Sequence, residues 1–376
     1  MHKLTRIVLA ILALALLASC GTLPESRADP HDTLGTSALA GLLSPLQLGN
    51  VFFDGETPRV GVRAEGERVR WELRDLRGVR VLEGEQPARH GTLTLRLPRG
   101  ERGFYRLTVE DLQGGTVLNR AETTLAVLSR HDFSRFGPED SIFAAQTHFG
   151  QFIGGKPEYD PASQSYVGLG QPKNDPELAP LLAYAGVREV RDELPWSTVE
   201  PPEGETRGVY AFPESYDRYV AALEAQDIGL YSILNYGNRL YDTDAEGVGA
   251  IPYTDEGRAG FAAYALALLE RYGDAITGFE VWNEINAGAA PWNRGPCRNQ
   301  PPLQPEVMRC HAALYRATHE ALEAVRPELP VTGPAGVTLP YGYLEAIFRE
   351  GALDYLDAVT VHPYGYPAAP EFAEQV

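Results

Sequence analysis

The chain has 376 residues, of which 44% are hydrophobic, which is enough for at least one large core and favours two domains. Asp and Glu total 51 against 33 Lys and Arg, which gives a formal net charge of −18. Such a surface repels phosphate groups, so the composition argues against nucleic acid as a partner and against electrostatic binding to anionic membranes. A neutral polymer such as a polysaccharide meets no such repulsion.

The first residues have the pattern of a bacterial export signal. A positively charged start over residues 1–6 is followed by an unbroken apolar run over residues 7–17, which is short for a transmembrane helix. The run ends in the sequence LASCG at residues 17–21, which resembles the lipobox of bacterial lipoproteins, in which the Cys thiol carries the lipid. The resemblance implies that Cys20 anchors the protein to the membrane, in the outer membrane or at the cell surface. An ordinary secretion signal with an incidental Cys is the alternative.

Residues 21–48 are rich in Ser, Pro, Gly and Thr, and this composition predicts a tether. Residues 49–130 alternate apolar and polar side chains in short runs between turn residues, which predicts an antiparallel β-sandwich. The run Gly103–Val109 is similar to a late strand of immunoglobulin-like accessory domains. Such a domain serves as a spacer or stabiliser, and carbohydrate binding is the alternative role. The expected inward-facing residues are Val60, Val62, Val69, Trp71, Leu73, Leu93, Leu95, Leu97, Tyr105, Leu107, Val109, Leu125 and Val127.

From residue 141 to residue 376 the pattern changes to alternating strands and helices. Repeated strand–helix units with right-handed crossovers build a parallel sheet, as an open doubly wound sheet or a closed barrel. No Gly-rich phosphate-binding motif opens any of these helices, so a nucleotide cofactor has no support. The expected strands span residues 141–149, 187–191, 229–234, 276–282, 331–333 and 358–361, and the expected helices span residues 176–185, 213–226, 254–272, 305–325 and 341–348.

The fourth of these strands ends in the sequence Trp282-Asn283-Glu284. At the carboxyl end of a barrel strand, polar side chains point into the substrate cleft. A carboxyl group there, beside aromatic rings that exclude water, tends to stay protonated and can give its proton to a leaving oxygen. The adjacent Asn can bind a sugar hydroxyl. The alternative is a helix N-cap Asn followed by a Glu that the helix dipole favours.

A Glu that follows an Asn at the end of strand four resembles clan A of the retaining glycoside hydrolases. The stretch 191–201, followed by Gly204 and by residues 210–212, resembles the "R…W…EP…G.Y.F" stretch after strand two of that clan. Within the clan, residues 234–238 and 282–286 are most similar to family thirty-nine and its relatives, which include β-xylosidases and endoglycosidases acting on bacterial exopolysaccharide.

The resemblance covers residues 141–366 and implies a (β/α)8 TIM barrel that needs no cofactor. It implies hydrolysis of β-linked poly- or oligosaccharides with retention, with Glu284 as general acid and base. It gives Arg191 the role of supporting the catalytic carboxylates, since a guanidinium offers a rigid fork of donors. A structural ion pair of Arg191 with Asp192 or Glu193 is the alternative. The expected substrate-binding residues are Arg191, Asn283, His148, Trp196, Asn235, Tyr236, Trp282, His362 and Tyr364, with Trp292 as a weaker sugar platform.

The sequence departs from the clan at the second carboxylate. Retaining enzymes need two carboxyl groups about 5 to 5.5 Å apart, and in this clan the second is a Glu at the end of strand seven. The sequence ends at Val376, shortly after the sixth expected strand, and Glu371 and Glu374 lack strand context. We therefore expect the barrel to be truncated after strand six, with the nucleophile beyond the chain end. A catalytically inactive carbohydrate-binding lipoprotein is the alternative function.

Two cysteines, Cys297 and Cys310, remain when Cys20 carries lipid. An even remainder in an exported protein predicts a disulfide bond, whose short loop is worth about 3 kcal/mol on the chain-entropy model. No Cys or His cluster with zinc spacing accompanies them, so no metal is expected.

The lipobox resemblance makes one directly testable prediction. Cys20 carries lipid, and the protein is recovered in the membrane fraction of its native cells. Mass spectrometry of the mature amino terminus, combined with membrane fractionation, checks this. A Cys20→Ser variant is expected in the soluble fraction. Recovery of soluble wild-type protein with an unmodified Cys20 contradicts the prediction.

Overall fold

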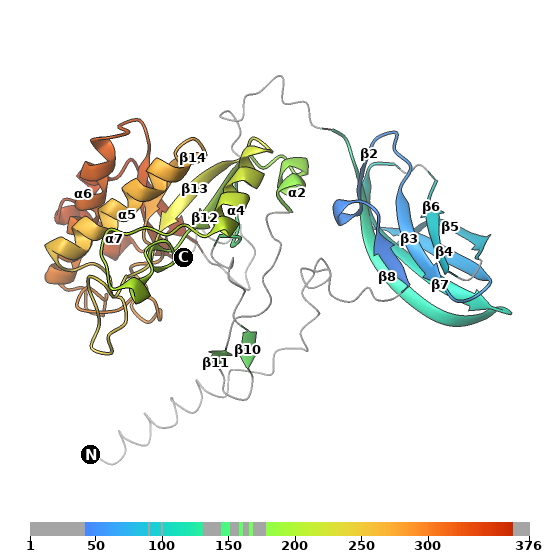
Figure 1. Ribbon diagram of the computed structural model, residues 1–376, viewed down its shortest axis with the longest axis horizontal. Helices are drawn as coiled ribbons and strands as arrows, with labels where there is room; N and C mark the ends of the chain where they lie inside the picture. The colour runs from blue at the N-terminus through green and yellow to red at the C-terminus, as the bar shows by residue number, and fades with distance from the viewer. Residues whose placement is uncertain are drawn as a thin grey trace, which may run out of the picture. The chain divides into compact units, whose positions relative to one another are not determined.

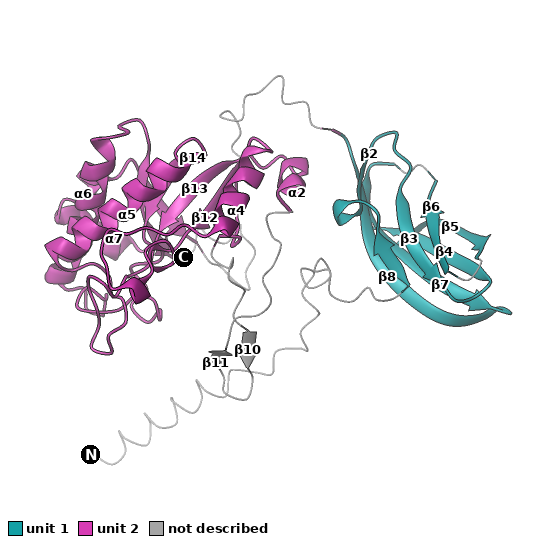
Figure 2. Cartoon of the chain, viewed as in Figure 1, with its two compact units in different colours: residues 1–129 teal, residues 130–376 magenta. Residues whose placement is uncertain are grey.

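The computed structural model describes residues 42–88, 91–98, 101–130, 144–150, 158–160, 165–167 and 178–363. The chain divides into two compact units, residues 1–129 and residues 130–376 (Figure 2). Cys20, Tyr364 and the expected export signal lie outside the described residues. Within the described part of the chain, no helix is both long and apolar enough to cross a membrane.

The first unit consists of two β-sheets. A three-stranded antiparallel sheet has the order β1-β3-β6, and a five-stranded sheet has the order β2-β8-β7-β4-β5, in which only β2 pairs in parallel. The elements are β1 (Leu43–Pro45), the 3-10 helix η2 (Leu48–Asn50), β2 (Val51–Phe53), β3 (Arg59–Ala64), β4 (Arg68–Asp75), β5 (Arg80–Pro87), β6 (Gly91–Arg96), β7 (Gly103–Gln113) and β8 (Thr116–Leu128).

The two sheets of this unit share one hydrophobic core. The residues that alternate in the sequence are the ones that pack there, for example Val62 of β3 and Leu107 of β7, which are fully buried. The expected tether over residues 21–48 runs too far, because β1 lies within it and pairs with β3. Leu43 explains the difference, since its side chain is buried in the same core. The immunoglobulin-like character of the unit stays a prediction.

The second unit contains a six-stranded sheet with the order β9-β12-β13-β14-β15-β16 (Figure 1). All five strand pairs are parallel, and each strand lies beside the next one of the set. A doubly wound sheet reverses its strand order at a switch point, so the sequential order indicates a parallel half-barrel. The strands are β9 (Ala144–Gln146), β12 (Glu189–Glu193), β13 (Gly229–Leu234), β14 (Ile276–Val281), β15 (Val331–Val337) and β16 (Ala358–His362).

Helices connect these strands and cover the sheet. They are α2 (Ala179–Tyr184), the short α3 (Trp196–Val199), α4 (Glu214–Glu224), α5 (Asp255–Tyr272), α6 (Pro305–Glu323) and α7 (Tyr341–Arg349), with 3-10 turns η6 (Pro202–Gly204) and η7 (Ala352–Tyr355); β10 (Glu158–Asp160) and β11 (Ser165–Val167) form a separate hairpin. The buried face of α5 contains Phe261, Tyr264 and Leu268.

The expected helix over residues 305–325 ends earlier, at Glu323, and part of its buried face is polar. Val325 lies beyond the helix and is 59% exposed, whereas the polar residues His311 and Thr318 are buried. Thr318 satisfies its hydroxyl by donating to the carbonyl oxygen of Leu314 at 2.9 Å. An apolar periodicity cannot identify a face whose buried polar groups are satisfied by specific partners.

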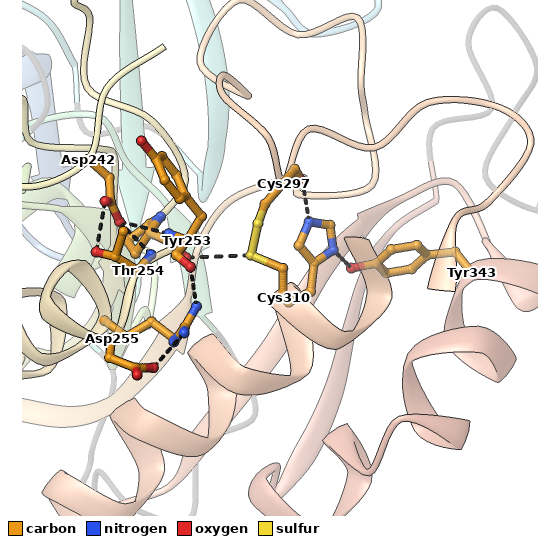
Figure 3. The surroundings of a disulfide bond; sticks show 10 residues. Asp242, Tyr253, Thr254, Asp255, Cys297, Cys310 and Tyr343 are labelled. Carbon is orange, nitrogen blue, oxygen red and sulfur yellow. Dashed lines mark hydrogen bonds and ion pairs between the residues drawn. A yellow bond between two sulfur atoms is a disulfide. The ribbon is translucent and has the colours of Figure 1, made fainter. Parts of the chain in front are cut away.

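The expected disulfide bond is present between Cys297 and Cys310, whose Cα atoms are 6.0 Å apart (Figure 3). Beside it, His311 Nε2 lies 2.7 Å from the carbonyl oxygen of Cys297, and Nδ1 lies 2.8 Å from the hydroxyl of Tyr343. A carbonyl only accepts, so Nε2 donates to it and Nδ1 accepts from Tyr343. Burial lowers the pKa of His311 to about 4 and keeps the ring neutral.

This buried histidine predicts a loss of stability in acid. Between about pH 6.5 and pH 4 the unfolded chain binds a proton that the folded chain does not, so the free energy of unfolding falls as the pH falls. A His311→Gln variant is less stable at neutral pH, but its melting temperature depends less on pH over this range. Thermal unfolding from pH 4 to pH 7.5 checks this, with His319→Gln on the same helix as control. Equal pH dependence of wild type and His311→Gln contradicts the prediction.

Candidate active site

The candidate acid/base Glu284 lies three residues after β14, at the carboxyl end of the parallel sheet. Its Oε1 is 2.8 Å from Nδ1 of His362, the last residue of β16. Both side chains are mostly buried, with exposed fractions of 14% for Glu284 and 17% for His362. The two side chains belong to the ends of two different strands, and the fold places them next to each other.

Arg191 of β12 connects the same region to the sheet interior. Its Nε donates to Oε2 of Glu280 at 3.1 Å, its Nη2 donates to Oε1 of the same residue, and its Nη2 also donates to Oδ1 of Asn283 at 3.1 Å. A further bond joins Arg191 to Gln146 of β9. Burial alone would lower the pKa of Arg191, but the hydrogen bonds and charge of Glu280 raise it, so the guanidinium stays charged. The ion-pair partner is Glu280, not Asp192 or Glu193.

Arg191 can contact both Glu280 and Asn283 because the backbone after β14 departs from a regular strand. Residues three apart on a strand face opposite sides of the sheet. Trp282 and Glu284 have left-handed φ angles of 68° and 53°, and this change of direction returns Asn283 to the side of Glu280. A non-glycine residue in this region costs on the order of 1 to 3 kcal/mol and persists where surrounding contacts hold it.

The amide of Asn283 is oriented by two neighbours. Its Oδ1 accepts from Arg191 at 3.1 Å, and its Nδ2 donates to the hydroxyl of Tyr236 at 3.4 Å. Tyr236 follows β13, and burial together with the charges of Glu193 and Glu284 raises its pKa, so the phenol is neutral. Its ring lies 5.8 Å, centroid to centroid, from that of the half-buried Trp292.

Two acidic residues at the end of β12 face different environments. Asp192 accepts hydrogen bonds from the hydroxyls of Thr147 at 2.6 Å and Tyr219 at 2.8 Å. Glu193 accepts from the amide of Asn235. Burial, assisted by the charge of Asp192 and opposed by that of Arg191, raises the pKa of Glu193 to about 8. At neutral pH Glu193 is therefore a neutral acid.

Three residues expected to bind substrate are inaccessible. Trp196 is 1% exposed, because it begins α3 and its ring stacks on Tyr264, with centroids 5.9 Å apart and planes 15° apart. Trp282 and Asn235 are fully buried. The prediction that these three side chains contact sugar is wrong, since each packs against or bonds to the protein itself.

The other expected residues have more open positions. His148 follows β9 and is exposed, whereas Tyr236 and Asn283 are half-buried. Tyr364 lies outside the described residues. The sequence analysis did not identify Glu280, because this residue lies inside the fourth strand and not at its carboxyl end. Among the described residues, no group of three or more His, Cys, Asp or Glu side chains could hold a metal ion.

Comparison with solved structures identifies glycoside hydrolases of family 39, in clan A, as structural neighbours at low identity. A family 39 glycoside hydrolase from the gut symbiont Bacteroides cellulosilyticus WH2 has a TM-score of 0.63 and 20% identity over 88% of this chain and 58% of that enzyme. The chain thus spans less than two thirds of that enzyme's length. At this identity the likeness shows the fold.

Two further neighbours align less well. A GH39 enzyme from Xanthomonas axonopodis pv. citri matches with a TM-score of 0.38 and 20% identity over 58% of this chain and 40% of its own. A monomeric β-xylosidase from Caulobacter crescentus CB15 matches with a TM-score of 0.39 and 19% identity over 59% and 42%. No protein-family model and no curated protein sequence matches the chain.

The neutral state of Glu193 predicts how stability depends on pH. Between about pH 4.5 and pH 8 the unfolded chain releases a proton that the folded chain keeps, so the free energy of unfolding falls as the pH rises. Glu193→Gln, which mimics the neutral acid, removes this dependence. Its melting temperature relative to wild type is therefore higher at pH 8 than at pH 5. Glu189→Gln, at the other end of β12, is the control. A difference from wild type that is the same at both pH values sinks the assignment.

Proposed function

We propose that the second unit supplies the general acid/base residue of the active site of a retaining glycoside hydrolase. This enzyme acts on β-linked poly- or oligosaccharides. The observation that carries the proposal is the position of the Glu284 carboxyl group, at the carboxyl end of a parallel sheet, 2.8 Å from His362 Nδ1 and next to an Asn283 amide held on both sides. The fold that the chain shares with a family 39 glycoside hydrolase supports it.

In the first step Glu284 donates its proton to the leaving glycosidic oxygen, and in the second it accepts a proton from the attacking water. His362 keeps the carboxyl group in one orientation through the hydrogen bond between Nδ1 and Oε1. Retention also requires a carboxylate nucleophile about 5 to 5.5 Å away. We assign this role to neither Glu280, which is paired with Arg191, nor Glu193, which is buried against Asn235.

Asn283 and Trp292 are the proposed sugar contacts. The two hydrogen bonds of Asn283 leave its second Oδ1 lone pair and second Nδ2 hydrogen for a sugar hydroxyl. Trp292 is half-buried and lies beside Tyr236, so its ring offers an apolar surface near Glu284. Trp292 is therefore the proposed sugar platform in place of Trp196, which is buried. The lipobox-like sequence at Cys20 supports a place in the cell envelope, where exopolysaccharide is a candidate substrate.

The role of Glu284 is tested in the full-length protein, which includes the expected nucleophile, with a panel of β-linked polysaccharides and aryl β-glycosides. Glu284→Gln is expected to lower kcat/KM about 10²- to 10⁴-fold on substrates with poor leaving groups, and much less on activated aryl glycosides, which need no proton. Product stereochemistry, followed by NMR, is expected to show retention.

Glu224→Gln, an exposed residue of α4, is the matched control and is expected to equal wild type. Equal activity of Glu284→Gln and wild type refutes the proposal. Sugar binding without turnover by the wild-type protein favours the alternative of a catalytically inactive carbohydrate-binding lipoprotein.

A further inference from the structure

Asn293 lies outside every motif of the sequence, in the loop between β14 and α6, and it is 1% exposed. Its Nδ2 donates to the carbonyl oxygen of Glu284 and to that of Ala287, both at 2.8 Å. Its Oδ1 accepts from the indole Nε1 of Trp282 at 2.7 Å. The side-chain amide of Asn293 therefore makes three hydrogen bonds, two as donor and one as acceptor, to the segment that carries the candidate acid/base.

Two of these hydrogen bonds go to the residues of the segment that have left-handed φ angles. Trp282 and Glu284, on either side of Asn283, have φ angles of 68° and 53°. Such conformations are maintained where neighbouring groups over-determine them. Asn293 binds the side chain of one and the backbone carbonyl of the other, so it links the two turns of the backbone that direct Asn283 and Glu284.

The loop that carries Asn293 is itself fixed at several points. Its Cys297 is bonded to Cys310 of α6, and the carbonyl oxygen of Cys297 accepts from His311. Trp292 Nε1 lies 3.3 Å from the carbonyl oxygen of Asn283. Because α6 is a long helix packed on the sheet, these bonds give Asn293 a rigid support.

We propose that Asn293 is a positioning residue for Glu284, holding its backbone so that the carboxyl group faces the leaving oxygen and His362. The proposal rests on the acid/base role proposed above. Asn293 does not itself touch the substrate, since it is buried and its amide is occupied by the protein. Its effect is confined to the step that needs the Glu284 proton.

The test compares Asn293→Ala with Asn299→Ala, which changes a buried Asn of the same loop whose side-chain amide donates to Asn286 rather than to Glu284. For Asn293→Ala, kcat is expected to fall on the order of 10- to 100-fold on poor leaving groups, with little change for activated aryl glycosides and little change in KM. Asn299→Ala is expected to lower the melting temperature without altering the dependence on the leaving group.

Two further variants sharpen the comparison. Asn293→Asp keeps the acceptor for Trp282 but places a carboxylate against two carbonyl oxygens, so it is expected to lose activity as Asn293→Ala does. Trp282→Phe combined with Asn293→Ala is expected to cost little more than Asn293→Ala alone, because both changes remove the same bond.

A second readout needs no turnover. The Glu284 carboxyl signal, assigned in ¹³C-labelled protein by its loss in Glu284→Gln, is compared at one fixed pH. Asn293→Ala is expected to change the chemical shift of this signal, because the backbone that carries the carboxyl group moves, and Asn299→Ala is not. Equal behaviour of the two Asn variants in both readouts overturns the positioning role. Activity of Glu284→Gln equal to wild type, together with a changed Glu284 signal in Asn293→Ala, overturns the proposed function instead and leaves the positioning of Glu284 standing.

Discussion

Inside the parallel sheet, the guanidinium of Arg191 on β12 reaches across β13 to the carboxylate of Glu280 on β14. Glu280 is 2% exposed, and removing the partner of so deeply buried a charge costs on the order of 3 to 5 kcal/mol. The same guanidinium has donors left for Gln146 and Asn283. The ion pair therefore fixes the position of Arg191. Arg191 in turn orients the side-chain amide of Asn283, beside the candidate acid/base.

That arrangement explains why the backbone leaves strand geometry where it does. A regular continuation of β14 would place Glu280 and Asn283 on opposite faces. The left-handed Trp282 brings Asn283 back toward Arg191, and the left-handed Glu284 then directs the next carboxyl group to His362 at the end of β16. Contacts of Asn293 with both left-handed residues offset the cost of this path.

The sequence predicts the order of strands and helices well because each element has a single dominant periodicity. Residues 229–234 form β13 as expected, whereas β15 extends to Val337, four residues beyond the expected end. Proline rarely lies inside a strand, yet β15 continues past Pro334 with a shift in register. The burial of Trp196 and Asn235 could not be predicted, since it depends on how α3 and the end of β13 turn those side chains toward neighbours distant in sequence. Asn293 lies in a loop with no periodicity, so only its contacts reveal it.

Four carboxyl groups gather at or near this end of the sheet, and their surroundings assign them different chemistry. Asp192 is surrounded by hydroxyl and amide donors. Glu280 is neutralised by a guanidinium, and Glu193 is neutral because burial raises its pKa to about 8. Of the four, only Glu284 is partly exposed, and its carboxyl group lies beside the end of β16. A proton donor to substrate must be both accessible and held in one orientation, and that combination distinguishes Glu284 from its three neighbours.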